Sequence, residues 1–169
     1  MVSFRVKHGL FFKPRLKRLQ EMQAEIFRQL LLLIPDKVAY YSSFQSRVCG
    51  SPLLRMDILE RHPYTHFLRL TYQFDNNQQT EISPDAHIRV YLDARLAEVT
   101  SFDPAQGFRR LANPWYPPQQ MLQRSWRQNL ALDKWLGYLL HQGHSVATMQ
   151  PADDRISGKQ ANPVAETVS

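Results

Sequence analysis

The amino-acid sequence predicts an α+β protein with a single antiparallel sheet of about five strands, and with an N-terminal and a C-terminal amphipathic helix packed on one face of that sheet. Apolar residues recur at helical spacing near both ends of the chain, whereas residues 37–99 largely alternate between apolar and polar side chains. Turn-forming residues separate the alternating runs, and such short connections join antiparallel strands. Helices before and after a run of strands are typical of a sheet with helices on one face.

The first predicted element is a long helix that follows a basic arm. We expect residues 1–13 to form a flexible arm, and Pro14 can occupy the first helical turn because it needs no amide hydrogen bond there. Pro35 ends the helix because it cannot continue the backbone hydrogen bonding. The positions that repeat at helical spacing are Leu16, Leu19, Gln23, Ile26, Leu30 and Leu33.

Three strands are predicted next. Residues 37–48 form a strand candidate that a Gly-Ser-Pro turn ends, and residues 53–60 place Leu54 and Ile58 on one face. Residues 67–74 show the most regular alternation of the three. Alternation of this kind indicates strands with one buried and one solvated face.

A β-hairpin with one buried face is predicted over residues 87–99. The run alternates, turns at residues 93–95 and alternates again, while Ser-Pro-Asp at residues 83–85 predicts a separate turn before it. The residues expected on the buried side of the hairpin are Ile88, Val90 and Leu92.

The second predicted helix covers residues 119–142, and Gly143 is a suitable C-terminal cap. It follows a proline-rich aromatic segment at residues 113–118, which we expect to be extended. We therefore expect one α+β domain over residues 14–146. Residues 147–169 contain few large apolar groups, so we expect a disordered tail there.

Cysteine content and hydropathy indicate a cytoplasmic protein. Cys49 is the single cysteine and cannot form an internal disulfide bond, which favours a reducing compartment. No run of apolar residues is long enough to span a membrane as a helix. The N-terminus lacks the uninterrupted apolar region of a secretory signal.

The formal net charge of +6 raises the question of nucleic-acid binding. Residues 1–18 hold six of the 21 lysines and arginines and no acid, so the other 15 cations match the 15 acids. The excess charge therefore lies in the N-terminal segment. This segment contains no motif of a known nucleic-acid reader, which makes nucleic acid the least favoured partner.

Four stretches carry a resemblance to a known family. They are Glu-Arg-His-Pro-Tyr-Thr at 60–65, Ile-Arg-Val-Tyr-Leu-Asp-Ala at 88–94 with Ala-Glu-Val at 97–99, Tyr-Pro at 116–117, and Asn129 with Trp-Leu at 135–136. The chain resembles the YqiB-like family of uncharacterised bacterial cytosolic proteins, a domain of unknown function, and the resemblance covers roughly residues 16–145. The resemblance implies a bacterial cytosolic protein and no particular reaction, because the family has no assigned activity.

No motif in the chain predicts a metal site, a cofactor or catalytic residues. His62 and His66 are four apart, but Pro63 prevents the regular helix that would bring them to one ion. The few glycines are not clustered, so no phosphate-binding loop is expected. Asp93 and Glu98 flank the hairpin turn, where a structural role for both carboxylates is favoured over acid–base catalysis.

The best candidate for a working surface is the polar face of the sheet. Arg69 points opposite Leu70, and Arg89 and Tyr91 point opposite Val90. Two guanidinium groups and a phenol suit an anionic ligand or an acidic peptide. The candidate ligand-binding residues are Arg69, Arg89, Tyr91, Asp93 and Glu98.

These observations predict a non-catalytic binding or regulatory module for a protein partner or a small anionic ligand. The alternative is a small enzyme of unknown reaction that uses the Arg89/Tyr91/Asp93/Glu98 face of the hairpin. A competing account of the same residues is that Arg89 and Glu98 form a cross-strand pair with no ligand.

Overall fold

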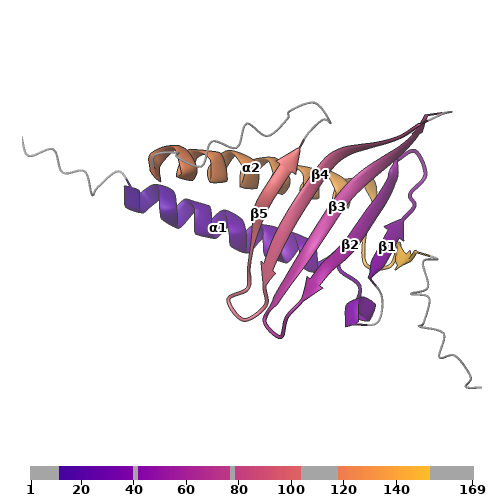
Figure 1. Cartoon of the computed structure of the whole chain (residues 1–169), viewed down its shortest axis with the longest axis horizontal. Coiled ribbons are helices and arrows are strands. Elements are labelled where there is room, and N and C mark those ends of the chain that lie inside the picture. Colours follow the sequence, from indigo (N-terminus) through magenta and orange to yellow (C-terminus); the bar gives the residue numbers. More distant parts are fainter. Residues whose placement is uncertain (1–11, 40–41, 77–78, 104–117, 153–169) are drawn as a thin grey trace, which may run out of the picture.

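The computed structural model describes residues 12–39, 42–76, 79–103 and 118–152, which form one six-stranded antiparallel sheet and two long helices (Figure 1). The α+β class and the antiparallel sheet are confirmed, with six strands in place of about five. Residues 1–11 of the arm expected over residues 1–13 and the aromatic segment before residue 118 lie outside the described residues, whereas residues 12 and 13 already belong to the first helix. The elements are α1 (Phe12–Leu31), η1 (Asp36–Ala39), β1 (Ser43–Ser46), β2 (Leu53–Arg61), β3 (Thr65–Asn76), β4 (Gln79–Tyr91), β5 (Leu96–Asp103), α2 (Pro118–Gln142) and β6 (Met149–Pro151).

The strand order in the sheet is β5-β4-β3-β2-β1-β6, so each of the first five strands lies beside its neighbour in sequence. The exception is β6, which lies in the region expected to be a disordered tail. Met149 pairs with Ser46 and is buried, and Pro151 pairs with Phe44. The local sequence does not predict β6, which forms because its backbone pairs with the otherwise free edge of β1. Residues 153–169 of the expected tail lie outside the described residues.

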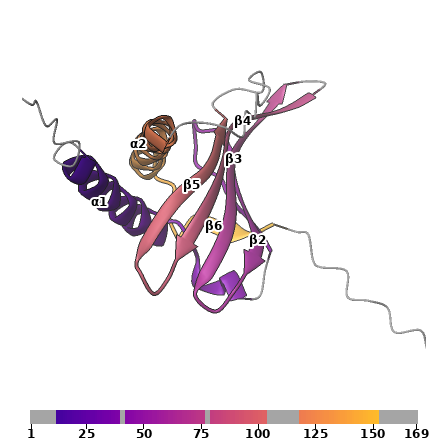
Figure 2. The same cartoon turned by 60° about the vertical axis from the view of Figure 1, so that its left-hand side comes forward.

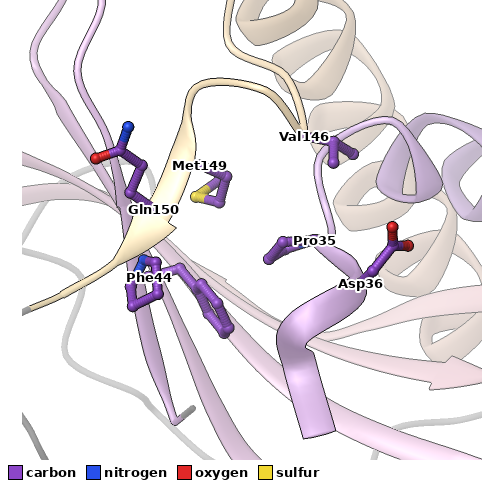
Figure 3. Close-up of a pocket in the computed structure, with 7 residues that line it drawn as sticks. Pro35, Asp36, Phe44, Val146, Met149 and Gln150 are labelled. Atoms are coloured by element: carbon purple, nitrogen blue, oxygen red, sulfur yellow. The ribbon is translucent and has the colours of Figure 1, made fainter. Parts of the chain in front are cut away.

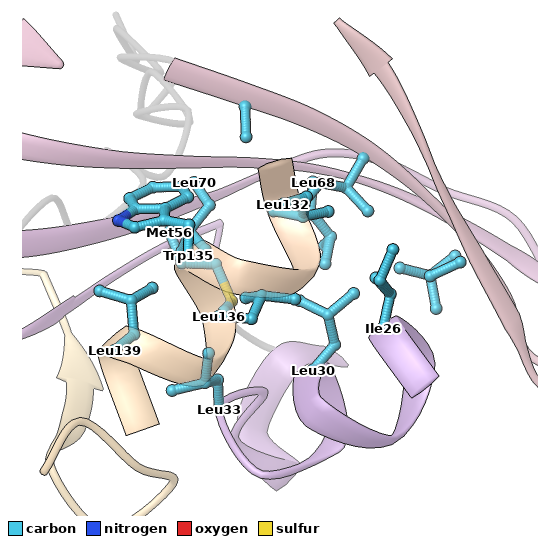
Figure 4. Packing of buried hydrophobic residues seen from close by; sticks show 14 of the residues in the cluster. Ile26, Leu30, Leu33, Met56, Leu68, Leu70, Leu132, Trp135, Leu136 and Leu139 are labelled. Carbon is cyan, nitrogen blue, oxygen red and sulfur yellow. The ribbon is translucent and has the colours of Figure 1, made fainter. Parts of the chain in front are cut away.

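Both helices lie on the same side of the sheet and contact each other (Figure 2). Of the predicted helical stripe, Leu19, Ile26 and Leu30 of α1 are buried, and so is Leu33 in the turn after it. Leu16 is exposed, because it lies near the start of α1, beyond the core. Apolar residues of the strands meet the helices in one continuous core (Figure 4). Its largest fully buried side chains include Phe44, Leu54, Met56, Leu68, Leu70, Ile88, Leu132, Leu136 and Leu139.

Two predicted elements differ in the structure. The strand expected over residues 37–48 is shorter, because η1 occupies its beginning and β1 covers only four residues. The residues 83–85, for which a turn was expected, lie inside β4. β4 pairs with β3 on both sides of them, with a register shift between Thr71 and Gln73. Proline has no amide hydrogen to donate, and such an irregularity tolerates it.

The hairpin of β4 and β5 is confirmed, with Ile88 and Val90 buried as predicted. Leu92, which was expected on the same buried side, is exposed because it lies in the turn beyond the end of β4. The period-two alternation of a strand no longer applies there.

Asn129 of α2 holds the irregular part of β5. The register between β4 and β5 shifts between His87 and Ile88, which leaves Thr100 as the extra residue. The amide of Val99 donates to the Asn129 side-chain oxygen at 3.3 Å, and the Asn129 amide donates to the backbone oxygen of Ser125 at 2.8 Å. The helix thereby satisfies a buried backbone donor of an edge strand.

Replacement of this buried amide tests the interaction. Asn129→Ala should lower the free energy of unfolding by about 1–3 kcal/mol, because the Val99 amide loses its partner in a dry environment. Gln123→Ala, at an exposed position of the same helix, should change it by less than about 0.5 kcal/mol. Urea denaturation measures both values, and equal midpoints for the two variants would contradict this role of Asn129.

Candidate functional site on the uncovered face of the sheet

The face of the sheet opposite the helices carries the polar side chains of β2, β3, β4 and β5. Burial alternates along these strands, so that Leu68, Leu70, Ile88 and Val90 face the helices and the intervening residues face away. We call this surface the open face. It comprises Arg55, Asp57, Phe67, Arg69, Asp85, His87, Arg89, Tyr91 and Glu98.

A trio of polar side chains lies at one end of the open face, on β4 and β5. The Tyr91 hydroxyl donates to Glu98 Oε1 at 2.7 Å, and Arg89 Nη1 donates to Tyr91 Oη at 3.3 Å. Arg89 Nη1 also lies 3.5 Å from Glu98 Oε1. Arg89 Cζ lies 4.7 Å from the ring centroid of Phe67 on β3, so the guanidinium is held by a cation–π contact as well.

The electrostatic environment raises the pKa of two members of the trio, Tyr91 and Arg89. Burial is the main cause that raises the pKa of Tyr91, and its hydrogen bond to Glu98 raises it further, although Arg89 opposes this. The hydrogen bond to Tyr91 raises the pKa of Arg89. At neutral pH the phenol therefore stays a hydrogen-bond donor and the guanidinium stays charged.

The other arginines of the open face are also paired. Arg69 forms a two-pronged interaction with Asp85, from Nε to Oδ1 at 2.9 Å and from Nη2 to Oδ2 at 2.7 Å. This hydrogen bonding is the main cause that raises the pKa of Arg69. Arg55 Nε donates to Asp57 Oδ1 at 2.9 Å, and the Ser43 hydroxyl donates to the same oxygen at 2.6 Å. Each guanidinium thus has a carboxylate partner.

The structure brings four of the five candidate residues to the open face. Arg69, Arg89, Tyr91 and Glu98 lie there, and neither helix covers them. Asp93 lies in the exposed turn after β4 and makes no hydrogen bond or ion pair with any residue that the structure describes. The competing account that Arg89 pairs with Glu98 agrees with the 3.5 Å separation.

Sequence reasoning missed four members of this surface, namely Arg55, Asp57, Phe67 and Asp85. Asp85 was assigned to a turn, so its pairing with Arg69 was not expected. Asp57 and Phe67 were passed over, although their alternation with Met56, Ile58 and Leu68 placed them on the polar face. The alternation in β2 and β3 was the signal that could have found both.

A buried polar network lies on the other side of the sheet. Ser46 Oγ lies 2.8 Å from His144 Nδ1, and Ser51 Oγ lies 3.1 Å from His144 Nε2. Tyr72 Oη lies 3.3 Å from the same Nε2 atom, and Thr148 Oγ1 lies 2.7 Å from Ser46 Oγ. The partners of the imidazole are hydroxyl groups, with no carboxylate among them. The network therefore ties the end of α2 to β1 and β3 and lacks the acid of a hydrolytic triad.

A cavity of about 440 Å³ lies beside β1, β6 and the chain that leads into η1 (Figure 3). Asp36 is the charged member of its lining, and a single carboxylate does not form the acid–base pair that proton-transfer chemistry requires. The lining residues are Pro35, Asp36, Phe44, Val146, Met149, Gln150 and Pro151.

Among the described residues, no group of three or more His, Cys, Asp or Glu side chains is close enough together to hold a metal ion. Neither of the long helices, as far as they are described, is apolar enough to cross a membrane.

Comparison with known proteins gives one match. A family model described as "Protein of unknown function (DUF1249)" matches residues 29–145, which is more than half of the chain. No curated protein and no solved structure matches the chain. The matched range includes α2 and all strands except β6. That the chain is YqiB-like and bacterial stays a prediction.

A double-mutant cycle tests the pair on β4 and β5. With Arg89→Met and Glu98→Gln, the coupling free energy should be about 0.2–1 kcal/mol, because the two side chains are 37% and 32% exposed and share Tyr91. A second cycle with Lys17→Met and Glu21→Gln is the control, since that pair is 3.9 Å apart and 78% and 63% exposed. Equal coupling in the two cycles, measured by urea denaturation, would argue against a specific trio.

The network around His144 predicts a pH dependence of stability. Burial lowers the pKa of His144 in the folded chain below its ordinary value of about 6.5. The unfolded chain then takes up a proton first, so stability should be complete above about pH 6.5 and fall as the pH falls below it. When denaturation is measured between about pH 7.5 and pH 5, His144→Gln should lose less free energy of unfolding than the natural chain does.

His66 contributes to the same measurement. Burial, Arg61 and His62 lower its pKa, so it adds a loss of the same sign. The free energy of unfolding of His144→Gln should therefore still fall with falling pH, but less steeply than that of the natural chain. An identical slope in His144→Gln and the natural chain would exclude His144 as the cause.

Proposed function

The chain belongs to the DUF1249 family of proteins of unknown function, and from its own side chains we propose that it is a non-catalytic binding or regulatory module whose open face receives a protein partner. The observation that carries the proposal is the set of three guanidinium–carboxylate pairs across β2, β3, β4 and β5, which neither helix covers. Charge pairs in fixed positions complement a partner surface that carries the opposite pattern.

The pairing of each arginine favours a protein partner over a small anion. An anion at Arg69 would compete with a carboxylate that already makes two hydrogen bonds, and an anion at Arg89 would compete with Glu98. A protein surface supplies groups of both signs and therefore does not need to break these pairs. Held guanidinium groups also lose little conformational entropy on binding.

The Arg89/Tyr91/Asp93/Glu98 face supports catalysis less well. A general acid or base works best with a pKa near the operating pH, whereas the pKa of Tyr91 is shifted upward and away from neutrality. Asp93 lies in the turn outside the trio. We therefore retain the enzyme only as the alternative that the sequence suggested.

The proposal includes a cytoplasmic location. It is supported by Cys49, which is free and exposed in the turn after β1. A free exposed thiol is compatible with a reducing compartment.

Exchange of one ion pair tests the proposal. The variant Arg69→Asp/Asp85→Arg keeps an internal pair but reverses its charges on the open face. With the intact chain as bait, the amount of its specific partner retained should fall at least about tenfold, because like charges then face each other. The matched control is an exposed pair of α1, exchanged as Glu25→Arg/Arg28→Glu.

Two measurements decide the outcome. Thermal unfolding should show that the exchanged variant is still folded, and quantification of the captured proteins should show a loss for the open-face exchange alone. Equal retention by both exchanged variants, or no protein retained specifically by the natural chain, would refute a docking role for the open face.

A further inference from the structure

Two long stretches of the sequence contain cations but no acids. Residues 1–20 and residues 104–132 together carry ten of the 21 lysines and arginines and none of the 15 acids. The remaining 11 cations therefore face all 15 acids. The net charge of +6 conceals a segregation of charge between these two stretches and the rest of the chain.

The helices α1 and α2, which hold the described residues of these stretches, run in the same direction. The Gln29 amide donates to Asp133 Oδ1 at 3.0 Å between the helices, and beyond both helices the Val146 amide donates to the Leu32 oxygen at 2.8 Å. Both contacts therefore come in the same order along the two helical segments. The N-terminal halves of the helices therefore lie at the same end of the molecule (Figure 1).

The described cations at this end are exposed and almost free of partners. Arg18 on α1 and Arg124 and Arg127 on α2 make no hydrogen bond or ion pair with the part of the chain that the structure describes. Lys17 reaches only Glu21, at 3.9 Å and with both side chains largely in solvent. These cations differ from the arginines of the open face, each of which is held by a carboxylate.

Large aliphatic side chains are exposed beside these cations. Leu16 on α1 is 49% exposed and Met121 on α2 is 61% exposed. We define the basic end by Leu16, Lys17, Arg18, Met121, Arg124 and Arg127.

We propose that the basic end binds the surface of a lipid bilayer that contains anionic headgroups. The cations attract the negatively charged headgroup plane, and the aliphatic side chains of Leu16 and Met121 enter the boundary with the acyl chains. The chain lies on the bilayer, since no described helix could cross it. A nucleic acid would satisfy the cations but offers no apolar layer to the aliphatic side chains.

The physics of the surface sets the expected magnitudes. A lysine or arginine near an anionic bilayer strengthens binding about fivefold, and the effect falls off within a Debye length of about 10 Å at moderate salt. Loss of two cations from the basic end should therefore weaken binding about 25-fold. The same two charges removed one Debye length further along the helices should matter much less.

The test uses the intact chain and sedimentation with vesicles of phosphatidylcholine, with and without phosphatidylserine. The natural chain should bind the anionic vesicles at low salt, and Arg124→Gln/Arg127→Gln should bind them about 25-fold more weakly. The matched control Arg28→Gln/Lys134→Gln removes two exposed cations further along α1 and α2, and should change binding by less than about threefold. Absence of binding by the natural chain, or an equal loss in both variants, would overturn the proposal.

A third variant separates a bilayer from other polyanions. Met121→Gln keeps every charge, and it should weaken vesicle binding while leaving any binding to a labelled DNA duplex unchanged. If Met121→Gln left vesicle binding unchanged, or if the duplex displaced the chain fully from the vesicles, the basic end would be a nucleic-acid surface and the bilayer proposal would fail.

Discussion

Because the side chains of a strand alternate between two faces, burial of one face of the sheet beneath α1 and α2 decides where the other side chains of the strands lie. Leu70 and Ile88 of the strands and Leu132 of α2 belong to one core. A register slip of one residue in a strand would turn its buried side chains toward solvent. The two register shifts of β4 are tolerated because the apolar residues on either side of each shift still point to the face that the helices cover. Asn129 supplies the hydrogen bond that one of them requires.

The same constraint explains the character of the open face. With Leu54, Met56, Leu68, Leu70, Ile88 and Val90 of the central strands buried on the helix side, the opposite face collects arginines and acids at cross-strand distances. They neutralise one another in pairs such as Arg69 with Asp85. A surface built in this way presents a fixed pattern of both signs rather than a field of one sign, and such a pattern favours recognition of a partner over concentration of small ions.

Charge at the helix ends follows a different rule. The parallel arrangement of α1 and α2 brings their N-terminal halves to one end of the molecule, and Arg18, Arg124 and Arg127 have no acidic partner among the described residues. The protein therefore has two kinds of charged surface on one small scaffold, one internally compensated and one uncompensated. The uncompensated one is the more sensitive to salt, because exposed charges without partners act at longer range.

The sequence by itself determined the class of the fold, both helices and the faces of the strands, because hydrophobic periodicity is a local property that each segment carries. It also placed Arg69, Arg89, Tyr91 and Glu98 on one polar face. Only the tertiary structure decided that β6 completes the sheet, that Asp85 neutralises Arg69, and that the N-terminal halves of α1 and α2 lie at one end. These outcomes depend on contacts between residues far apart in the chain, and no local pattern encodes the partner of an edge strand or the relative direction of two helices.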